Sequence, residues 1–111
     1  MATTKEYIDY VCESIKDLSL GIITNKKMFG EYMVYINAKP ILLVCDNTVY
    51  IKMKEEIKDY MENTDTASPY KGAKEHYILD VENHDLARAV LPILENITEV
   101  PKSRKKENKK C

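Results

Sequence analysis

Two adjacent residues, Cys45 and Asp46, have the side-chain types of a catalytic pair. A thiol becomes a nucleophile when a base activates it, and here His76 or His84 would supply that base. The surroundings of Cys45 favour another interpretation, because it ends an apolar run and no cation close to it in the sequence would lower its pKa. His84 falls in the first turn of a predicted helix, where a polar residue is common. We therefore expect a protein that is not an enzyme.

The same side-chain types give little support to a metal site. Structural zinc sites usually combine ligands in pairs at short spacing. The cysteines Cys12, Cys45 and Cys111 include no close pair, and a predicted strand and the start of a helix separate His76 from His84. We therefore expect no metal ion and no other cofactor. Unpaired cysteines of this kind are typical of a reducing compartment.

The overall composition is typical of one soluble domain. The chain has 111 residues, of which 44% are hydrophobic and 32% are charged, and a chain of this size buries a core without disulfides or metals. The longest apolar run, residues 40–45, is much shorter than the ~20 residues of a membrane helix, and the first residues lack the apolar stretch of a signal peptide. We predict a single domain over residues 1–101, located in the cytoplasm and without a membrane partner.

A basic segment follows the predicted domain. Residues 102–110 carry six Lys or Arg and one Glu, so the rest of the chain has eleven basic and seventeen acidic residues and a net charge of −6. We favour a disordered, solubilising tail over residues 102–111, because it has no aromatic side chain to stack on a base. The alternative is that it binds nucleic acid. The residues that would make this contact are Lys102, Arg104, Lys105, Lys106, Lys109 and Lys110.

Helical periodicity predicts a first helix over residues 3–18. Thr3 and Glu6 fit a capping box, in which the two side chains satisfy free amides at the start of a helix. Gly21 is suited to a helix end. The apolar residues between them recur at helical spacing and predict one buried stripe: Tyr7, Ile8, Val11, Cys12, Ile15 and Leu18.

Three strands are predicted next, over residues 27–36, 40–45 and 48–53. These segments are rich in Tyr, Val and Ile and are separated by short turn-forming segments. Connections this short cannot make a parallel crossover, so we expect an antiparallel meander. Residues 41–45 are apolar at every position, which predicts a central strand covered on both faces.

The remaining chain predicts a short helix over residues 54–62, a loop over 63–74 and a strand over 75–82. The short helix is expected to turn inward the side chains of Ile57, Tyr60 and Met61.

A last helix is predicted from a cap at Asn83 to about Thr98, with a kink or a break at Pro92. The order of elements is therefore α-β-β-β-α-β-α. Strands that cluster in this way predict an α+β fold, with a four-stranded and mainly antiparallel sheet packed by helices.

Lys26, Lys27, Met28, Phe29 and Gly30 form a compact motif ahead of the meander. One interpretation is a basic, aromatic loop that contacts a partner or a phosphate. The interpretation we favour is structural: Met28 and Phe29 point to opposite faces of a strand, Gly30 allows a bend or a close approach, and the lysines are solvated.

This motif is followed along the chain by Leu43-Val44-Cys45-Asp46 and Val49-Tyr50-Ile51-Lys52. In this order, from about residue 20 to residue 97, the motifs resemble the N-terminal domain of the TfoX/Sxy family of competence regulators. The resemblance implies a stand-alone domain of that kind and no catalytic mechanism. It marks as candidate interaction residues Lys26, Lys27, Met28, Phe29, Gly30, Asp46, Tyr50 and Lys52.

The exposed face of the predicted sheet is a further candidate surface. Tyr32, Tyr35 and Tyr50, with Met33, are suited to contact a protein partner or a second copy of the chain, and the alternative is ordinary packing beneath a helix. The resemblance to competence regulators, with the absence of a catalytic constellation, implies a protein that acts by protein–protein interaction in transcriptional regulation. Binding of nucleic acid through the basic tail is the alternative.

Overall fold

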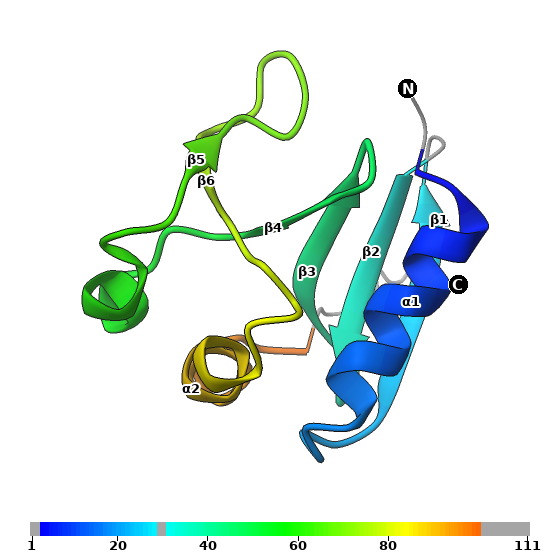
Figure 1. Ribbon diagram of the computed structural model, residues 1–111, viewed down its shortest axis with the longest axis horizontal. Coiled ribbons are helices and arrows are strands. Elements are labelled where there is room, and N and C mark those ends of the chain that lie inside the picture. The colour runs from blue at the N-terminus through cyan, green and yellow to red at the C-terminus, as the bar shows by residue number, and fades with distance from the viewer. Residues whose placement is uncertain (1–2, 29–30, 101–111) are drawn as a thin grey trace, which may run out of the picture.

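A six-stranded sheet forms the centre of the protein, in a computed structural model that describes residues 3–28 and 31–100. The strand order is β1-β2-β3-β4-β6-β5, and every pair of neighbours is antiparallel (Figure 1). The strands are β1 (Ile23–Met28), β2 (Glu31–Ile36), β3 (Lys39–Cys45), β4 (Thr48–Ile51), β5 (Thr66–Ala67) and β6 (His76–Ile78). The helices are α1 (Lys5–Lys16), the 3₁₀ helix η1 (Glu55–Met61) and α2 (His84–Ile97).

The α+β class and the antiparallel sheet are confirmed, but the predicted four strands and the predicted order of elements are wrong. Residues 27–36, predicted as one strand, span parts of two strands that pair from Ile23 with Ile36 to Met28 with Glu31. The sequence pattern hides β1 because this edge strand is exposed at its four interior positions and therefore carries polar residues. β5 has only two residues and lies within the predicted loop.

Two-residue turns connect β2 to β3 and β3 to β4. The second has the predicted length, whereas the first is shorter than predicted because β3 begins at Lys39. Asn37 and Ala38 have φ angles of 53° and 68°, and Asp46 and Asn47 have φ angles of 51° and 55°. Two successive left-handed residues are typical of tight hairpins, since their twist matches that of the flanking strands. Gly21 supports the first turn, because a Cβ added there would lie 2.4 Å from the side-chain oxygen of Asn37.

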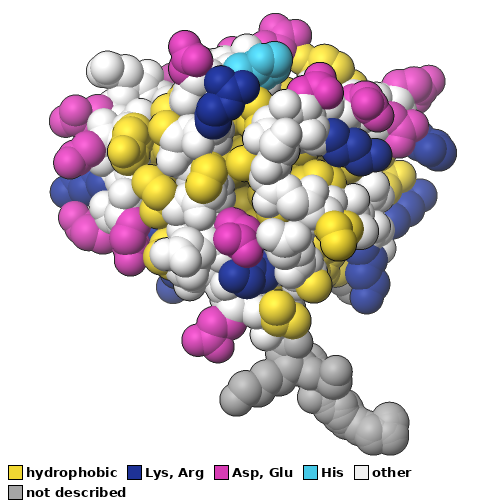
Figure 2. All heavy atoms as spheres, turned by 90° about the horizontal axis from the view of Figure 1, so that it is seen from below, with side chains coloured by type: hydrophobic (Ala, Val, Ile, Leu, Met, Phe, Trp, Pro, Cys, Tyr) yellow, Lys and Arg dark blue, Asp and Glu magenta, His cyan; other side chains and the backbone are white. Residues whose placement is uncertain are grey.

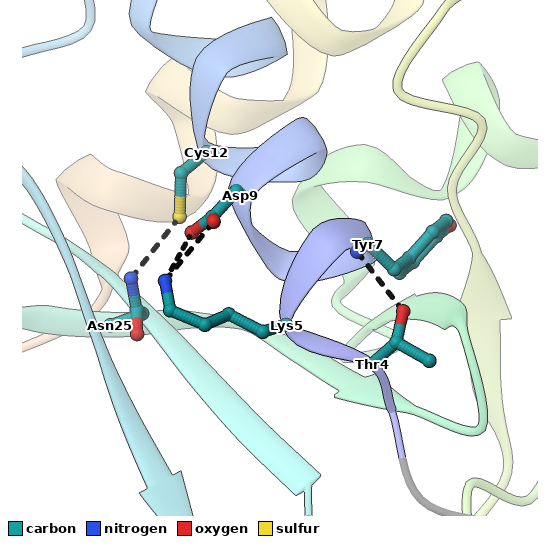
Figure 3. A network of polar contacts seen from close by, with 6 residues as sticks. All are labelled: Thr4, Lys5, Tyr7, Asp9, Cys12 and Asn25. Carbon is teal, nitrogen blue, oxygen red and sulfur yellow. Dashed lines mark hydrogen bonds and ion pairs between the residues drawn. The ribbon is translucent and has the colours of Figure 1, made fainter.

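The first helix is capped by Thr4 and not by Thr3, so the predicted capping box is wrong. The Thr4 hydroxyl accepts a hydrogen bond from the amide of Tyr7 at 3.1 Å (Figure 3). Thr3 is buried instead: its hydroxyl donates to the Glu31 carboxylate at 2.7 Å and accepts from the amide of Asn47 at 3.2 Å. Thr3 thus ties the start of α1 to β2 and to the turn after β3.

The buried stripe of α1 is confirmed in the residues Ile8, Val11, Cys12, Ile15 and Leu18. Tyr7 is only half-buried. The solvent side carries an ion pair between Lys5 and Asp9, with 3.1 Å between Nζ and Oδ2 (Figure 3). On the sheet side, the Asn25 amide of β1 donates to the Cys12 sulfur at 3.5 Å. The helix therefore packs with its apolar stripe on the sheet.

All three helices contribute to a core on one face of the sheet. They bring to it the side chains of α1, Ile57 and Met61 of η1, and Leu91 and Leu94 of α2. Tyr60 is 51% exposed, so its predicted inward orientation is wrong, and the inward positions of η1 are four residues apart. The strand residues of this core face are at most 1% exposed: Val34, Ile36, Leu42, Val44, Val49 and Ile51.

The last helix confirms both predicted ends. Asn83 caps it by accepting a hydrogen bond from the amide of Leu86 at 3.2 Å, and Thr98 is its C-cap. Pro92 lies inside the helix, which continues to Ile97, so of the predicted kink or break the break is wrong. An interior proline removes one amide donor, and packing of the buried Leu91 and Leu94 on the core stabilises the surrounding turns.

A hydrogen bond and an ion pair between Lys39 and Glu95 join the end of α2 to the start of β3. The Lys39 ammonium donates to the backbone carbonyl of Glu95 at 2.8 Å and lies 3.0 Å from its carboxylate. These contacts, with a further hydrogen bond from Asn37, lower the pKa of Glu95. A cation at a helix C-terminus also interacts favourably with the helix dipole.

The left-handed backbone of Ala38 predicts the effect of replacing it. Because an L residue at φ 68° is strained and glycine is not, Ala38→Gly should raise the free energy of unfolding by about 1 kcal/mol. The same change at Ala89, inside α2, should lower it by about 1 kcal/mol. Urea unfolding of the two variants tests this. A lower stability for both variants would show that Ala38 is not strained.

Candidate functional site

The outer face of the sheet lies opposite the helices. We define it as the face that carries the side chains of Met28, Met33, Leu43, Cys45, Tyr50 and Ile78, as the strand register requires. Met33, Leu43 and Tyr50 are direct neighbours on β2, β3 and β4 and form a continuous apolar row. The helices pack on the opposite face of the sheet, so no helix of the described residues covers this row.

Two adjoining hollows lie on this face. The apolar hollow has a volume of about 500 Å³ and is lined by Met28, Glu31, Met33, Leu43, Cys45 and Tyr70. The second hollow, of about 420 Å³, shares Met33, Leu43 and Tyr70 with it and extends to Tyr50, Lys52 and His76. No residue of α1, η1 or α2 lines either hollow. Volumes of this order accommodate a ligand or several side chains.

Tyr70 belongs to the loop between β5 and β6, which stands at the top of Figure 1, away from α2. It lines both hollows and is still 61% exposed. An amphipathic side chain in this position offers a ring to a partner at little conformational cost. The face on the α2 side, seen in Figure 2, differs, because its hydrophobic side chains lie in small areas among charged ones.

A lysine cluster borders the second hollow. Lys52, Lys54 and Lys74 line a third hollow of about 510 Å³ together with Met53, Glu75 and His76. The three lysines are exposed and make no ion pair with any other described residue. Glu75 is the carboxylate among these residues, and it accepts a hydrogen bond from the Thr66 hydroxyl.

The motif residues predicted from the sequence that the structure describes lie on both faces of the sheet. Lys26 pairs with Met33 and therefore lies on the outer face, whereas Lys27 pairs with Tyr32 on the opposite face, and both lysines are exposed. Met28 lines the apolar hollow. Phe29 and Gly30 lie outside the described residues, as do the six basic residues predicted to contact nucleic acid.

The other predicted residues lie along the same face and its end. Tyr50 is buried in the outer face, with its ring edge-on to His76 at 6.5 Å between centroids. Lys52 belongs to the lysine cluster. Asp46 is an exposed turn residue at the end of the sheet, and its amide donates to the Glu31 carboxylate at 3.0 Å.

The predicted set of exposed tyrosines is partly wrong. Tyr32 has the opposite parity to Met33 and packs against the core. The residues that the sequence analysis did not identify are Leu43, Tyr70 and Lys74. Leu43 was expected to be covered on both faces, and the other two lie in a loop that carries no periodic signal. Their proximity to β3 and β4 arises only from the tertiary fold.

The chemistry of Cys45 is that of a buried thiol. The side chain is 2% exposed, and burial raises its pKa to about 11, with further contributions from the charges of Glu31 and Asp46. His76 Nδ1 lies 2.8 Å from the backbone oxygen of Lys74, and His84 is the first residue of α2. Neither histidine contributes to the shift of the Cys45 pKa. A thiol in this state is a weak nucleophile.

Residues 3–28 and 31–100 contain no group of three or more His, Cys, Asp or Glu side chains that could hold a metal ion. None of their helices has the length and apolar character needed to cross a membrane.

These features define a small α+β domain whose antiparallel sheet is packed by helices on one face and bears apolar hollows on the other. The chain belongs to the TfoX N-terminal domain family, whose model matches residues 16–90. It is similar to an uncharacterised 12.7 kDa protein from the trpE 5′ region of Spirochaeta aurantia, with 32% identity over 85 residues. That alignment covers 75% of this chain and 74% of the relative.

The burial of Cys45 predicts slow alkylation in the folded protein. At about pH 8, iodoacetamide should modify Cys45 at least about a hundredfold more slowly in buffer than in urea, because both burial and a pKa of about 11 suppress the thiolate. Peptide mass spectrometry of a Cys111→Ser variant measures the rate at Cys45 and at the buried Cys12 separately. A rate at Cys45 that matches the unfolded chain would instead indicate an accessible, reactive thiol.

Proposed function

We propose that this protein is a cytoplasmic, non-enzymatic domain that binds another protein through the outer face of its sheet and acts in the regulation of transcription. The observation that carries the proposal is the apolar row of Met33, Leu43 and Tyr50, which the helices leave uncovered. Partly covered apolar side chains of this kind mark interaction surfaces in soluble proteins.

Three features support the remaining parts of the proposal. The high pKa of the Cys45 thiol and its lack of a base favour binding over catalysis. The free thiols of Cys12 and Cys45 fit a reducing compartment. The role in transcription follows the resemblance to competence regulators and the membership of the TfoX N-terminal domain family.

A pair of exposed tyrosines allows a matched test. Tyr70 lies on the hollows of the outer face and Tyr60 on η1, and they are 61% and 51% exposed. A photoreactive amino acid at position 70 should cross-link a discrete cellular protein, whereas the same group at position 60 should not. With that protein purified, Tyr70→Ala should weaken binding at least about tenfold and Tyr60→Ala less than about twofold.

The proposal is wrong if position 70 yields no cross-linked protein beyond the background of position 60. Cross-links only between copies of this chain would indicate that the outer face forms a homodimer and does not bind a separate protein. Circular dichroism of both alanine variants checks that each is folded, which is expected because both side chains are largely solvated.

The basic tail favours a second candidate function, binding of nucleic acid. Residues 102–110 concentrate six positive charges in a chain that is otherwise acidic. A chain that ends at Pro101 should then lose DNA and RNA binding measured by fluorescence anisotropy at low salt, and binding by the full chain should fall steeply with added salt. Equal binding by the two chains, or no binding by either, contradicts this candidate.

A further inference from the structure

We infer that the partner recognised by the outer face is an acidic protein segment that inserts one or two apolar side chains into the hollows and places its carboxylates on the lysine cluster. This inference rests on the proposed function and adds the chemistry of the partner. Its basis is the juxtaposition of unpaired cations and apolar hollows on one face of an otherwise acidic domain.

Apolar side chains of the outer face form one half of the site. Leu43 and Met33 line both hollows, Cys45 lines the apolar hollow, and Tyr50 lines the second hollow. The one carboxylate in the apolar hollow, Glu31, is already engaged: it accepts from the Thr3 amide at 3.1 Å, the Thr3 hydroxyl at 2.7 Å and the Asp46 amide at 3.0 Å. All three hydrogen bonds reach Oε1 and hold this carboxylate at the end of the sheet. Most of the other residues that line the hollow are apolar, so the hollow favours an apolar insert.

Methionine and tyrosine linings also suit such an insert. Met28 and Met33 have flexible, polarisable side chains that adapt to different apolar groups, and Tyr70 adds an aromatic ring to the lining. A leucine or phenylalanine side chain is therefore a better fit than a charged group.

The cationic half of the site gathers three lysines around one carboxylate. Lys52, Lys54 and Lys74 surround the third hollow and form no ion pair with another described residue, and Glu75, which also lines this hollow, accepts a hydrogen bond from Thr66. The lysines therefore outnumber the carboxylate that lines the same hollow. An unpaired cluster attracts an anion at long range and orients it on contact.

Charge and shape favour an acidic protein segment over nucleic acid. Outside residues 102–110 the chain has a net charge of −6, which opposes a long polyanion such as nucleic acid more strongly than a short acidic segment confined to the lysine cluster. A nucleic-acid backbone would also leave the apolar row of Met33 and Leu43 unused.

Selection from a random peptide library tests the inference. Peptides displayed on phage and selected on the wild-type protein should be enriched in Asp and Glu next to a Leu, Phe or Trp. A selected peptide should bind about tenfold more weakly to Lys52→Gln/Lys74→Gln. The matched variant Lys16→Gln/Arg88→Gln, on exposed positions of α1 and α2, should bind within about twofold of wild type. Raising the salt from about 0.05 M to about 0.3 M should weaken binding several-fold.

The other outcomes separate this inference from the proposed function. The selected peptides could instead be apolar and neutral, or basic, and bind more weakly to Tyr70→Ala but not to Lys52→Gln/Lys74→Gln. That result would overturn the inference that the partner is acidic, and it would leave the proposal of protein binding by this face in place. A single-stranded oligonucleotide whose binding depends on Lys52 and Lys74 assigns the cluster to nucleic acid and overturns the inference. Absence of any enriched peptide also overturns it, and the cross-linking experiment at position 70 then decides the proposed function.

Discussion

The register of the β2-β3-β4 meander is the constraint on which the rest of the structure depends. Two-residue turns at Asn37-Ala38 and Asp46-Asn47 fix this register, and side chains in a strand alternate between faces. A slip by one residue would exchange the core face with the outer face. The register therefore decides at once which residues meet the helices and which remain available to a partner.

The alternation of side chains between the core face and the outer face is interrupted once in the β2-β3 pair, by a bulge on β3. Val34 pairs with Leu42 and Tyr35 with Pro40, so that Ile41 is an extra residue on β3. This bulge buries both Ile41 and Leu42, at 6% and 0% exposure. It explains why an uninterrupted apolar run does not require two covered faces. Beyond the bulge, Leu43 is half-buried and lines both outer hollows.

Two sets of polar contacts lie at opposite ends of the sheet. At one end, Glu31 joins Thr3 to the turn after β3, and at the other, Lys39 joins the end of α2 to the start of β3. These contacts hold α1 and α2 on the core face, and Glu31 is also the charged residue in the lining of the apolar hollow. Membership of the TfoX N-terminal domain family and the geometry of the outer face together make protein recognition the best-supported proposal.

The sequence by itself determined the elements whose signals are local. The apolar stripe of α1, the cap at Asn83 and the two tight turns follow from side-chain periodicity and backbone preference, and the ordered motifs around Met28, Val44 and Tyr50 were sufficient to identify the family. Only the tertiary structure decided what depends on contacts distant in sequence. Thr4 and not Thr3 caps α1, because Thr3 is hydrogen-bonded to Glu31. The polar residues of β1 form a strand because β2 supplies their hydrogen-bond partners. The tertiary structure also brought Tyr70 and Lys74 to the outer face, since the β5–β6 loop folds back on strands that lie about 25 residues earlier.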